Sequence, residues 1–194
     1  IIAMGLMSFR PDVETNPGRF NIFDLGNCRV MLDYGHNVSG YRSVFQLIKG
    51  LGAKRLVGII GMPGDRLDEN IKEAGKISAG VFSKIYIRED GDLRGRKPGE
   101  VAEILYQGVL EGGGRPEQIE IVLPETEALA VAVENALPGD LIVMFYECFD
   151  PVYQKVQELR ETRVTGDGSL TRLAAMENQG VGLEELSRTV HYHN

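Results

Sequence analysis

The sequence predicts an α/β fold of the Rossmann-like type, with a mostly parallel six-stranded sheet, one antiparallel strand and helices on both faces. Short apolar runs of strand length alternate with longer segments in which apolar residues recur at helical spacing. Most of these runs are continuously apolar, as in parallel strands that are covered on both faces. Clusters of turn residues separate the segments. The strands are expected at residues 19–24, 28–33, 54–60, 82–87, 119–123 and 140–146.

The elements follow one another in an order that fits this fold. The first two strands are joined by Leu25-Gly26-Asn27, which is short enough for a hairpin, so the first strand should be antiparallel. Strands that alternate with helices give a mostly parallel sheet for the remainder. The first helix carries one apolar stripe, formed by Val38, Tyr41, Val44, Phe45, Ile48 and Leu51. Further helices are expected at about 67–79, 99–110, 125–136 and 151–161.

The composition suits a globular domain and excludes several classes of protein. The chain has 194 residues, which suits one domain with or without an appendage, and 43% of them are hydrophobic. A net charge of −7 argues against a nucleic-acid-binding surface, and no apolar run approaches the roughly 20 residues of a membrane helix. Cys28 and Cys148 lie in apolar, strand-like runs and are expected in the core, with no metal site. We therefore expect a cytoplasmic protein that has neither nucleic acid nor membrane as a partner.

The two ends of the chain differ from the part between them. The chain begins in an apolar run rather than with Met, which suggests a piece of a longer protein. Residues 1–18 are expected to be the end of a preceding domain and a linker, residues 19–161 one domain, and residues 162–194 a tail. His191 and His193 in the tail could ligate a metal, but a frayed polar terminus is the simpler interpretation.

The turn after the second predicted strand carries the first candidate site. Asp33, Tyr34, His36 and Asn37 follow the apolar strand and directly precede a helix. In open α/β sheets, ligands bind at the carboxyl ends of the strands, near helix N-termini. These side chains therefore stand where a nucleotide would meet the sheet. The alternative is structural: Asn37 or Ser39 caps the helix, and His36 is an exposed turn residue.

A glycine-rich turn follows the third predicted strand. Gly61-Met62-Pro63-Gly64-Asp65-Arg66 again lies between a strand and a helix. Such a turn frees backbone N–H groups at a helix N-terminus, and Arg66 can add a bidentate contact to a phosphate. It is not a P-loop, because no Gly-Lys-Ser/Thr follows. The alternative is that Asp65 and Arg66 form a pair that caps the helix.

The most charged part of the chain, residues 88–100, follows the fourth predicted strand. An amino acid with a guanidinium side chain needs carboxylates for that group and a cation for its α-carboxylate. The loop offers both, in the side chains of Glu89, Asp90, Asp92, Arg94 and Arg96. Two alternatives remain open: a solvated charged face, and a mobile lid whose arginines pair with its own acids.

Together these turns resemble the motifs of the Mur ligase family. Asp33-Tyr34-Gly35-His36-Asn37 is similar to the Asp-Tyr-Ala-His-Asn-Pro signature that opens the C-terminal domain of these enzymes, and Gly64-Asp65-Arg66 to their Gly-Gly-Asp-Arg segment. Pro17-Gly18-Arg19 resembles the Pro-Gly-Arg at the start of that domain. The signature has two departures, Gly35 for Ala and Val38 for Pro, and neither removes a polar group.

The resemblance implies a role in ATP-dependent amide ligation, in which the γ-phosphate of ATP passes to a carboxylate and an amine attacks the acyl phosphate. It implies that ATP is contacted by Asp33, Tyr34, His36, Asn37, Gly64, Asp65 and Arg66. It also implies that Arg66 is catalytic when the domains close. The phosphate-binding loop, the acceptor site and most magnesium ligands would lie in a preceding central ATPase domain. This chain should therefore not catalyse the reaction alone.

The charged loop most closely resembles the cyanophycin synthetase branch of the family, which extends an Asp/Arg polymer. This resemblance implies that arginine is added to the aspartate side chain of a polypeptide acceptor. The residues implied to bind arginine are Glu89, Asp90, Asp92, Arg94 and Arg96. Two alternatives stay open: a Mur-type ligase for another amino acid, and a non-catalytic nucleotide-binding module. The chain lacks the Gly-x-Gly-x-x-Gly of dinucleotide folds, which argues against a nicotinamide-binding form of such a module.

Overall fold

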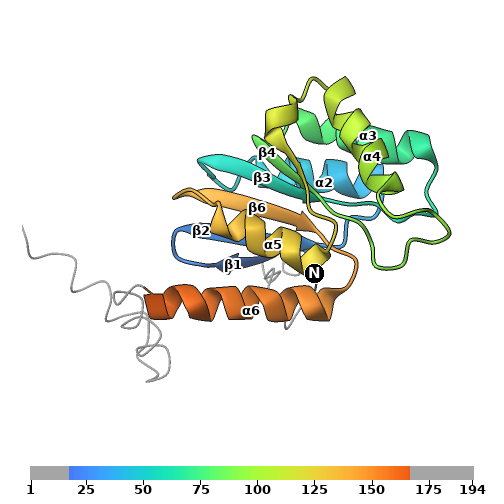
Figure 1. Ribbon diagram of the computed structural model, residues 1–194. Coiled ribbons are helices and arrows are strands. Elements are labelled where there is room, and N and C mark those ends of the chain that lie inside the picture. The colour runs from blue at the N-terminus through green and yellow to red at the C-terminus, as the bar shows by residue number, and fades with distance from the viewer. Residues whose placement is uncertain (1–17, 167–194) are drawn as a thin grey trace, which may run out of the picture.

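A six-stranded sheet forms the centre of the computed structural model, which describes residues 18–166 (Figure 1). The strands are β1 (Asn21–Asp24), β2 (Cys28–Asp33), β3 (Arg55–Ile60), β4 (Lys84–Ile87), β5 (Ile119–Ile121) and β6 (Asp140–Phe145). Their order across the sheet is β1-β2-β6-β3-β4-β5. β1 is antiparallel to β2, and the other neighbouring pairs are parallel. The predicted mixed sheet is therefore confirmed.

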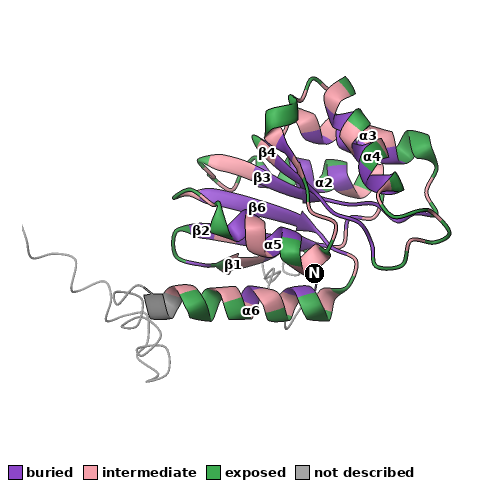
Figure 2. Cartoon of the chain, viewed as in Figure 1, coloured by how far each residue is buried: buried purple, intermediate pink, exposed green. Residues whose placement is uncertain are grey.

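Helices cover both faces of this sheet, as predicted. One face carries α2 (Val38–Ile48), α3 (Asp68–Ala79) and α4 (Glu100–Glu111), and the other carries α5 (Glu125–Glu134) and α6 (Phe149–Gly166) (Figure 1). A 3-10 turn, η1 (Pro116–Gln118), leads into β5. Between the two layers the central strands are almost wholly buried (Figure 2). Within residues 18–166, none of the helices is both long and apolar enough to cross a membrane.

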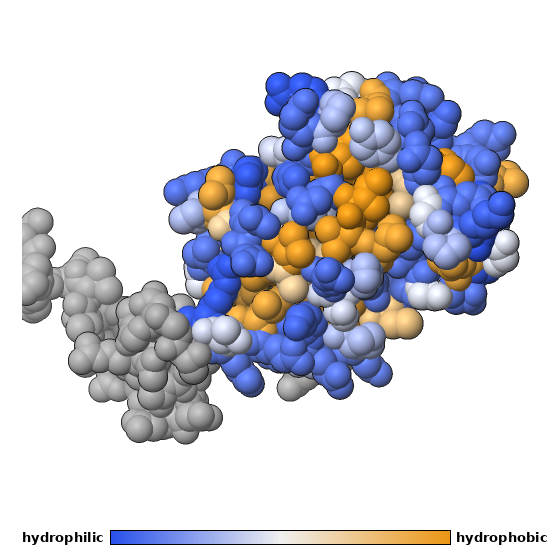
Figure 3. Space-filling view, in the orientation of Figure 1, coloured by the Kyte–Doolittle hydropathy of each residue, from blue (hydrophilic) through white to orange (hydrophobic). Residues whose placement is uncertain are grey.

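The two faces have separate hydrophobic cores, because successive side chains of a strand point to opposite faces. β6 is buried at every position: Val143 and Phe145 join the core under α2, α3 and α4, whereas Met144 joins the core under α5 and α6. This continuous burial is typical of a central parallel strand. The predicted stripe on α2 contributes to the core under α2, α3 and α4, with Tyr41, Val44, Phe45 and Ile48 buried. In the space-filling view, apolar residues also gather on the surface beside α5 (Figure 3).

The last helix is longer than the sequence suggests. α6 runs to Gly166 rather than to about residue 161, so residues 162–166, expected in the tail, belong to the helix. Of the segment expected to contain the end of a preceding domain and a linker, residues 1–17 lie outside the described residues. The tail from residue 167 also lies outside them, with His191 and His193.

The two cysteines differ in their environments. Cys28, at the start of β2, is buried as predicted. The expectation that Cys148 lies in the core is wrong, since its side chain is exposed. The apolar run of β6 ends at Phe145, and Cys148 lies beyond that end, in the turn that leads into α6.

The register of the strands brings four carboxyl ends to one edge of the sheet. Asp33, the last residue of β2, is paired with Phe145, the last residue of β6. Ile59 of β3 is paired with Met144, and the last residues of β3 and β4 are paired with each other. The three polar turns that follow β2, β3 and β4 therefore begin at the same edge, where open α/β sheets bind ligands.

The tight packing of β3 gives a prediction about stability. An added Cβ at Gly58 would lie 2.4 Å from the ring of Phe82. We expect Gly58→Ala to lower the free energy of unfolding by about 1–3 kcal/mol, because the ring or the strand must shift. Urea unfolding measures the change. Gly80→Ala is the matched control: an added Cβ there meets nothing within 4 Å, so its effect should stay within about 0.5 kcal/mol. Equal losses in both variants would contradict this account.

Candidate functional site

Three polar turns meet at the carboxyl edge of the sheet. Nε of Arg66 donates to the backbone oxygen of His36 at 3.4 Å, which joins the turn after β3 to the turn after β2. Arg96 donates from Nε to the carbonyl of Gly64 at 2.7 Å and from Nη2 to the carbonyl of Arg66 at 2.8 Å. The structure thus brings together the three segments that the sequence analysis selected separately.

Asp33 lies at the end of β2 with only 3% of its surface exposed. Its Oδ2 accepts a hydrogen bond from the backbone N–H of Phe20 at 3.3 Å. Burial raises the pKa of the Asp33 carboxyl, and the bond from Phe20 and the positive charge of Arg19 oppose that rise. Asp33 is therefore an acceptor in a poorly solvated position, where further hydrogen-bond donors would stabilise its charge.

The first described residues are fastened to the same edge. The hydroxyl of Tyr146 donates to the carbonyl oxygen of Gly18 at 2.8 Å, and the side chain of Asn21 accepts from the N–H of Gly18 at 2.6 Å. Phe20, whose N–H reaches Asp33, has a φ of 55°, a left-handed conformation that is uncommon outside glycine. Burial raises the pKa of Tyr146 to about 12, so its hydroxyl stays protonated and can donate at neutral pH.

Tyr34 and His36 form a small aromatic surface next to Asp33. Their ring centroids are 5.0 Å apart, and the ring of Tyr146 lies 5.7 Å from that of Tyr34. The guanidinium of Arg19 lies 5.4 Å from the centroid of Tyr34. Nδ1 of His36 lies 3.1 Å from the backbone oxygen of Tyr34, which fixes the orientation of the imidazole. Aromatic rings bordered by cations suit a planar base with a phosphate tail.

The predicted helix cap is present at the turn after β2 and absent at the turn after β3. Oδ1 of Asn37 accepts from the N–H of Gly40 at 2.8 Å, so Asn37 does cap α2. The N-cap residue of α3 is Leu67, and no side chain caps that helix. Asp65 and Arg66 do form a pair, at 3.5 Å, but the pair does not serve as the predicted cap. These two side chains are therefore not committed to the helix.

Glu89 is committed to the fold of its own loop. It is buried, and its two carboxylate oxygens accept from the backbone N–H groups of Gly99 and Ala102 at 2.8 and 2.9 Å. These are free amides at the start of α4, where a carboxylate is favoured. The sequence predicts Glu89 as a ligand for a guanidinium. In the structure, both of its oxygens bind backbone N–H groups, and these bonds anchor the loop to α4.

The two arginines of the loop pair with acids of the turn after β3 and of the first residues of α3 and α4. Arg94 pairs with Asp65 at 2.8 Å, and Arg96 pairs with Asp68 at 2.6 Å and with Glu100 at 2.9 Å. Exposed pairs of this kind contribute only about 0–1 kcal/mol each. They nevertheless connect the loop to the turn after β3. Asp92 is exposed, and its Oδ1 accepts from the N–H of Arg94 at 2.9 Å.

Arg88 is a site residue that the sequence analysis did not select. Its side chain is only 2% exposed, and its Nε and Nη2 donate to the carbonyl oxygen of Phe145 at 3.0 and 2.6 Å. Its Nη1 pairs with Asp90, and Glu125 lies 3.8 Å from its Nε. The available signal is a charged residue directly after an apolar strand, at the start of the charged loop, and the sequence gives Arg88 no role of its own there.

Two hollows lie at this edge, on either side of Asp90. A narrow crevice of about 10 Å³ is lined on one side by Tyr34, Gly35 and His36, so only the edge of a ligand could enter it. A wider groove of about 440 Å³ lies towards α5. Its lining combines apolar and acidic side chains, namely Leu93, Leu123, Pro98, Pro124, Pro151, Glu89, Asp90, Glu125 and Glu147, with Gly91 and Cys148.

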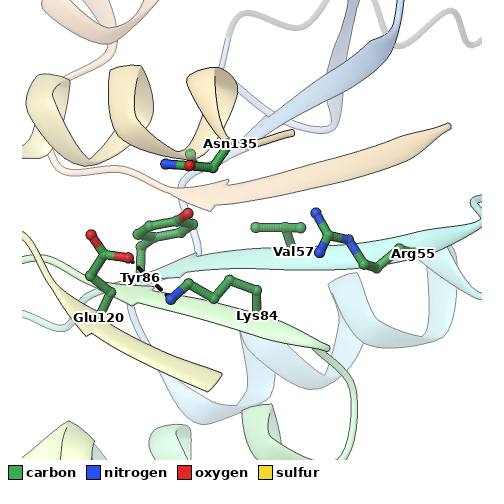
Figure 4. Close-up of a pocket in the computed structure, with 7 residues that line it drawn as sticks. Arg55, Val57, Lys84, Tyr86, Glu120 and Asn135 are labelled. Carbon is green, nitrogen blue, oxygen red and sulfur yellow. Dashed lines mark ion pairs between the residues drawn. The ribbon is translucent and has the colours of Figure 1, made fainter. Parts of the chain in front are cut away.

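A further pocket of about 300 Å³ lies towards the opposite edge of the sheet, where β3 and β4 begin (Figure 4). Its charged groups are already matched. Lys84 pairs with Glu120 at 3.0 Å, and Arg55 pairs with the buried Asp140 at 2.5 Å. A ligand would therefore have to displace existing pairs, and we place the candidate site at the carboxyl edge. Within residues 18–166, no group of three or more His, Cys, Asp or Glu side chains could hold a metal ion.

Comparison with known proteins identifies the family. The family model described as Mur ligase, glutamate ligase domain, matches residues 18–145. This chain belongs to the Mur ligase family. The cyanophycin synthetase of Crocosphaera subtropica is 39% identical to it over 146 residues, which are 75% of this chain and 16% of that protein. This Mur ligase domain therefore spans about one sixth of the curated relatives that it matches first.

Solved structures support the fold of this Mur ligase domain. A UDP-N-acetylmuramoyl-L-alanyl-D-glutamate–2,6-diaminopimelate ligase is similar with a TM-score of 0.64 and 17% identity, over 84% of this chain and 37% of the other. FolC of E. coli, solved in complex with ADP, has a TM-score of 0.54 and 22% identity, over 77% of this chain and 33% of the other. The predicted resemblance to the family and its fold are therefore confirmed.

The departure at Gly35 from the Mur ligase signature has a packing reason. An added Cβ at Gly35 would lie 2.5 Å from the ring of Phe145. That ring is stacked on Tyr41, with centroids 3.7 Å apart and planes within 10° of parallel. The hydroxyl of Tyr41 in turn donates to the carbonyl of Gly61 at 2.8 Å. The ring therefore occupies the space that the alanine methyl of the signature would need.

The burial of Asp33 predicts a pH-dependent effect of Asp33→Asn. Its folded-state pKa lies above the ordinary value of 3.8, so the folded protein binds this proton more tightly than the unfolded chain. The ionised carboxyl therefore destabilises the folded state once the pH exceeds the folded-state pKa. We expect the variant to unfold at a higher temperature than wild type at neutral pH, and the gain to vanish below the ordinary pKa. Thermal unfolding across this pH range, with the exposed Asp24→Asn as control, measures it; a gain that does not depend on pH would refute the assignment.

Proposed function

We propose that this domain supplies the nucleotide contacts and the pocket for the incoming amino acid in an ATP-dependent amide ligase of the cyanophycin synthetase type. In the proposed reaction, the γ-phosphate of ATP passes to the aspartate side-chain carboxylate of a polypeptide acceptor. The amine of arginine then attacks the acyl phosphate, so that a C–N bond forms and phosphate leaves. The observation that supports this most directly is the meeting of the three turns at one edge, beside an acid-rich groove.

The proposal divides the work between this domain and the remainder of a longer, cytoplasmic enzyme. A preceding central ATPase domain would supply the P-loop, the acceptor site and most magnesium ligands. This domain, proposed to span residues 19–161, would then bind ATP and arginine but would not catalyse alone. The fraction of the relatives that the chain spans, 16% of the C. subtropica protein, supports this division.

The nucleotide would lie over the crevice rather than inside it, because the crevice encloses only about 10 Å³. Asp33 is proposed to accept from the ribose hydroxyls, with Tyr34, His36 and Asn37 beside the base. The turn Gly64-Asp65-Arg66 would face the phosphates, and Arg66 would stabilise the transferred phosphoryl group when the domains close. Arg66 is 35% exposed and is held by the carbonyl of His36, so its remaining N–H groups can reach a phosphate.

The groove beside α5 fits the side chain of arginine. Leu93 and Leu123 would cover its methylene stem, while carboxylates of the groove and its rim meet the guanidinium. We propose Asp90 and Asp92 for this contact, with Glu89 holding the loop in place through α4. Arg94, which lines the crevice, would meet the α-carboxylate, and Arg96 would tie the loop to the nucleotide turn. The bound arginine would thus have its guanidinium among carboxylates and its α-carboxylate beside a cation.

Asp33→Asn tests the nucleotide half of the proposal in the ligase that carries this domain. Asparagine keeps an acceptor for the N–H of Phe20 but removes the charge that would bind the ribose. We expect the KM for ATP to rise about five- to tenfold, the difference between a charge-assisted and a neutral hydrogen bond, with little change in the KM for arginine. Steady-state kinetics measure both constants. An unchanged KM for ATP would remove Asp33 from the nucleotide site.

Asp92→Asn tests the amino-acid half. The asparagine oxygen can still accept from the N–H of Arg94, so the turn should persist while the charge is lost. We expect the KM for arginine to rise about tenfold and the KM for ATP to stay within about twofold. Asp24→Asn is a matched control, because Asp24 accepts from Gly26 with the same spacing, at 2.8 Å, near the opposite edge of the sheet. If both variants behave alike, the loop does not bind arginine.

A further inference from the structure

Arg88 bridges strands that are not neighbours in the sheet. It follows β4, yet its Nε and Nη2 donate to the carbonyl oxygen of Phe145 at the end of β6, and β3 lies between these two strands. Its backbone N–H continues the pairing with β3 by donating to Ile60 at 2.9 Å. One residue therefore connects the carboxyl ends of three strands. A guanidinium with only 2% exposure needs such partners, because an uncompensated buried charge is costly.

Gly61 provides the space for this bridge. An added Cβ at Gly61 would lie 2.4 Å from Nε of Arg88 and 2.6 Å from its Cζ, so the guanidinium passes directly over the glycine. The hydroxyl of Tyr41 holds both the N–H and the carbonyl of Gly61, at 3.1 and 2.8 Å. The backbone of Gly61, over which the Arg88 side chain crosses the end of β3, is therefore held in place by Tyr41.

Carboxylates connect Arg88 to the loop. Nη1 pairs with Asp90, at the start of the loop, and Nε lies 3.8 Å from Glu125, at the start of α5. The oxygens of Glu125 accept from the N–H groups of Glu147 and Cys148. Glu147 in turn accepts from the N–H of Gly91 at 2.6 Å. The contacts run from Arg88 through the start of α5 and the turn after β6 and return to the loop. All of the residues that they join beyond Arg88 line the acid-rich groove.

We propose that Arg88 is a positioning residue that holds residues 90–94 against the ends of β6 and α5, and so gives the amino-acid groove its shape. This inference rests on the proposed function for the identity of the substrate. Arg88 is assigned no contact with the amino acid, because its guanidinium is buried, binds Phe145 and Asp90, and does not line the groove. Its absence would release Asp90 and loosen the loop at the end that faces the groove.

Arg88→Lys in the full-length ligase tests this role. Lysine keeps the charge but cannot bind both Phe145 and Asp90 in the fork geometry of a guanidinium. We expect the KM for arginine to rise about tenfold, as for loss of a charge-assisted contact, while the KM for ATP stays within about twofold. Arg42→Lys is the control, since Arg42 pairs with Glu73 at an exposed position 57% accessible to solvent. Equal changes in both constants, or none, would overturn the role.

Hydrogen exchange separates this inference from the proposed function, because it needs no substrate. In Arg88→Lys, the amides of Gly91 and Asp92 should exchange faster than in wild type, while those of β6 keep their protection. Protection that is unchanged at Gly91 and Asp92 would overturn the positioning role whatever the enzyme ligates. A wild-type enzyme that does not use arginine, but whose loop loosens in the variant, would instead refute the proposed function and leave the positioning role intact.

Gly61→Ala provides a second route to the same result. The added methyl would push the guanidinium off Phe145 without changing any charge. We expect the same pattern of exchange and kinetics as for Arg88→Lys, and a double variant that is little worse than either single one, because both changes break one contact. Additive effects of the two substitutions would show that Gly61 and Arg88 act separately and would overturn the proposed bridge. If Arg88→Lys does not fold, Gly61→Ala alone carries the exchange test.

Discussion

The insertion of β6 between β2 and β3 is the constraint on which the carboxyl edge depends. β6 is the last strand along the chain, yet it is central in the sheet and buried throughout. It supplies Phe145 to Arg88 across 57 residues of sequence and Asp140 to Arg55 across 85 residues. β2 and β3 do not pair with each other, so the turns that follow them share an edge only after β6 has paired with both strands. The site therefore forms only when the sheet is complete, which requires contacts of long sequence separation.

The arrangement of the sheet could be predicted because local signals agree with one another. The continuously apolar runs predict buried parallel strands, the short turn Leu25-Gly26-Asn27 predicts the antiparallel hairpin, and the stripe on α2 predicts a helix that covers the sheet. The structure confirms all three. Proximity of Asp33, Arg66 and Arg96 could also be predicted, since each follows a parallel strand and parallel strands end at a common edge.

Side-chain burial at this edge could not be predicted from local patterns. Arg88 and Glu89 begin a charged run of the kind that usually forms a solvated loop, yet both are buried. Arg88 contacts Phe145 of β6 and Glu89 contacts Ala102 of α4, and both contacts join residues that are distant in sequence. The groove beside α5 was missed because Glu125 and Glu147 approach it from the far part of the chain. For Cys148 the error is the reverse, because a residue expected in the core is exposed. The apolar run continues in sequence beyond Phe145, where the strand ends.

The bond between Tyr146 and Gly18 has a mechanical consequence. Gly18 is held at 2.8 Å by the last buried aromatic residue after β6, and Phe20 is held two residues later by Asp33. An added Cβ at Gly18 would lie 2.0 Å from the Tyr146 hydroxyl, so no larger residue fits there without displacing the tyrosine. A displacement of Gly18 would therefore reach the end of β6 directly through Tyr146, and the end of β2 through Phe20 and Asp33. Gly18 and the candidate site are thus mechanically coupled through only a few residues.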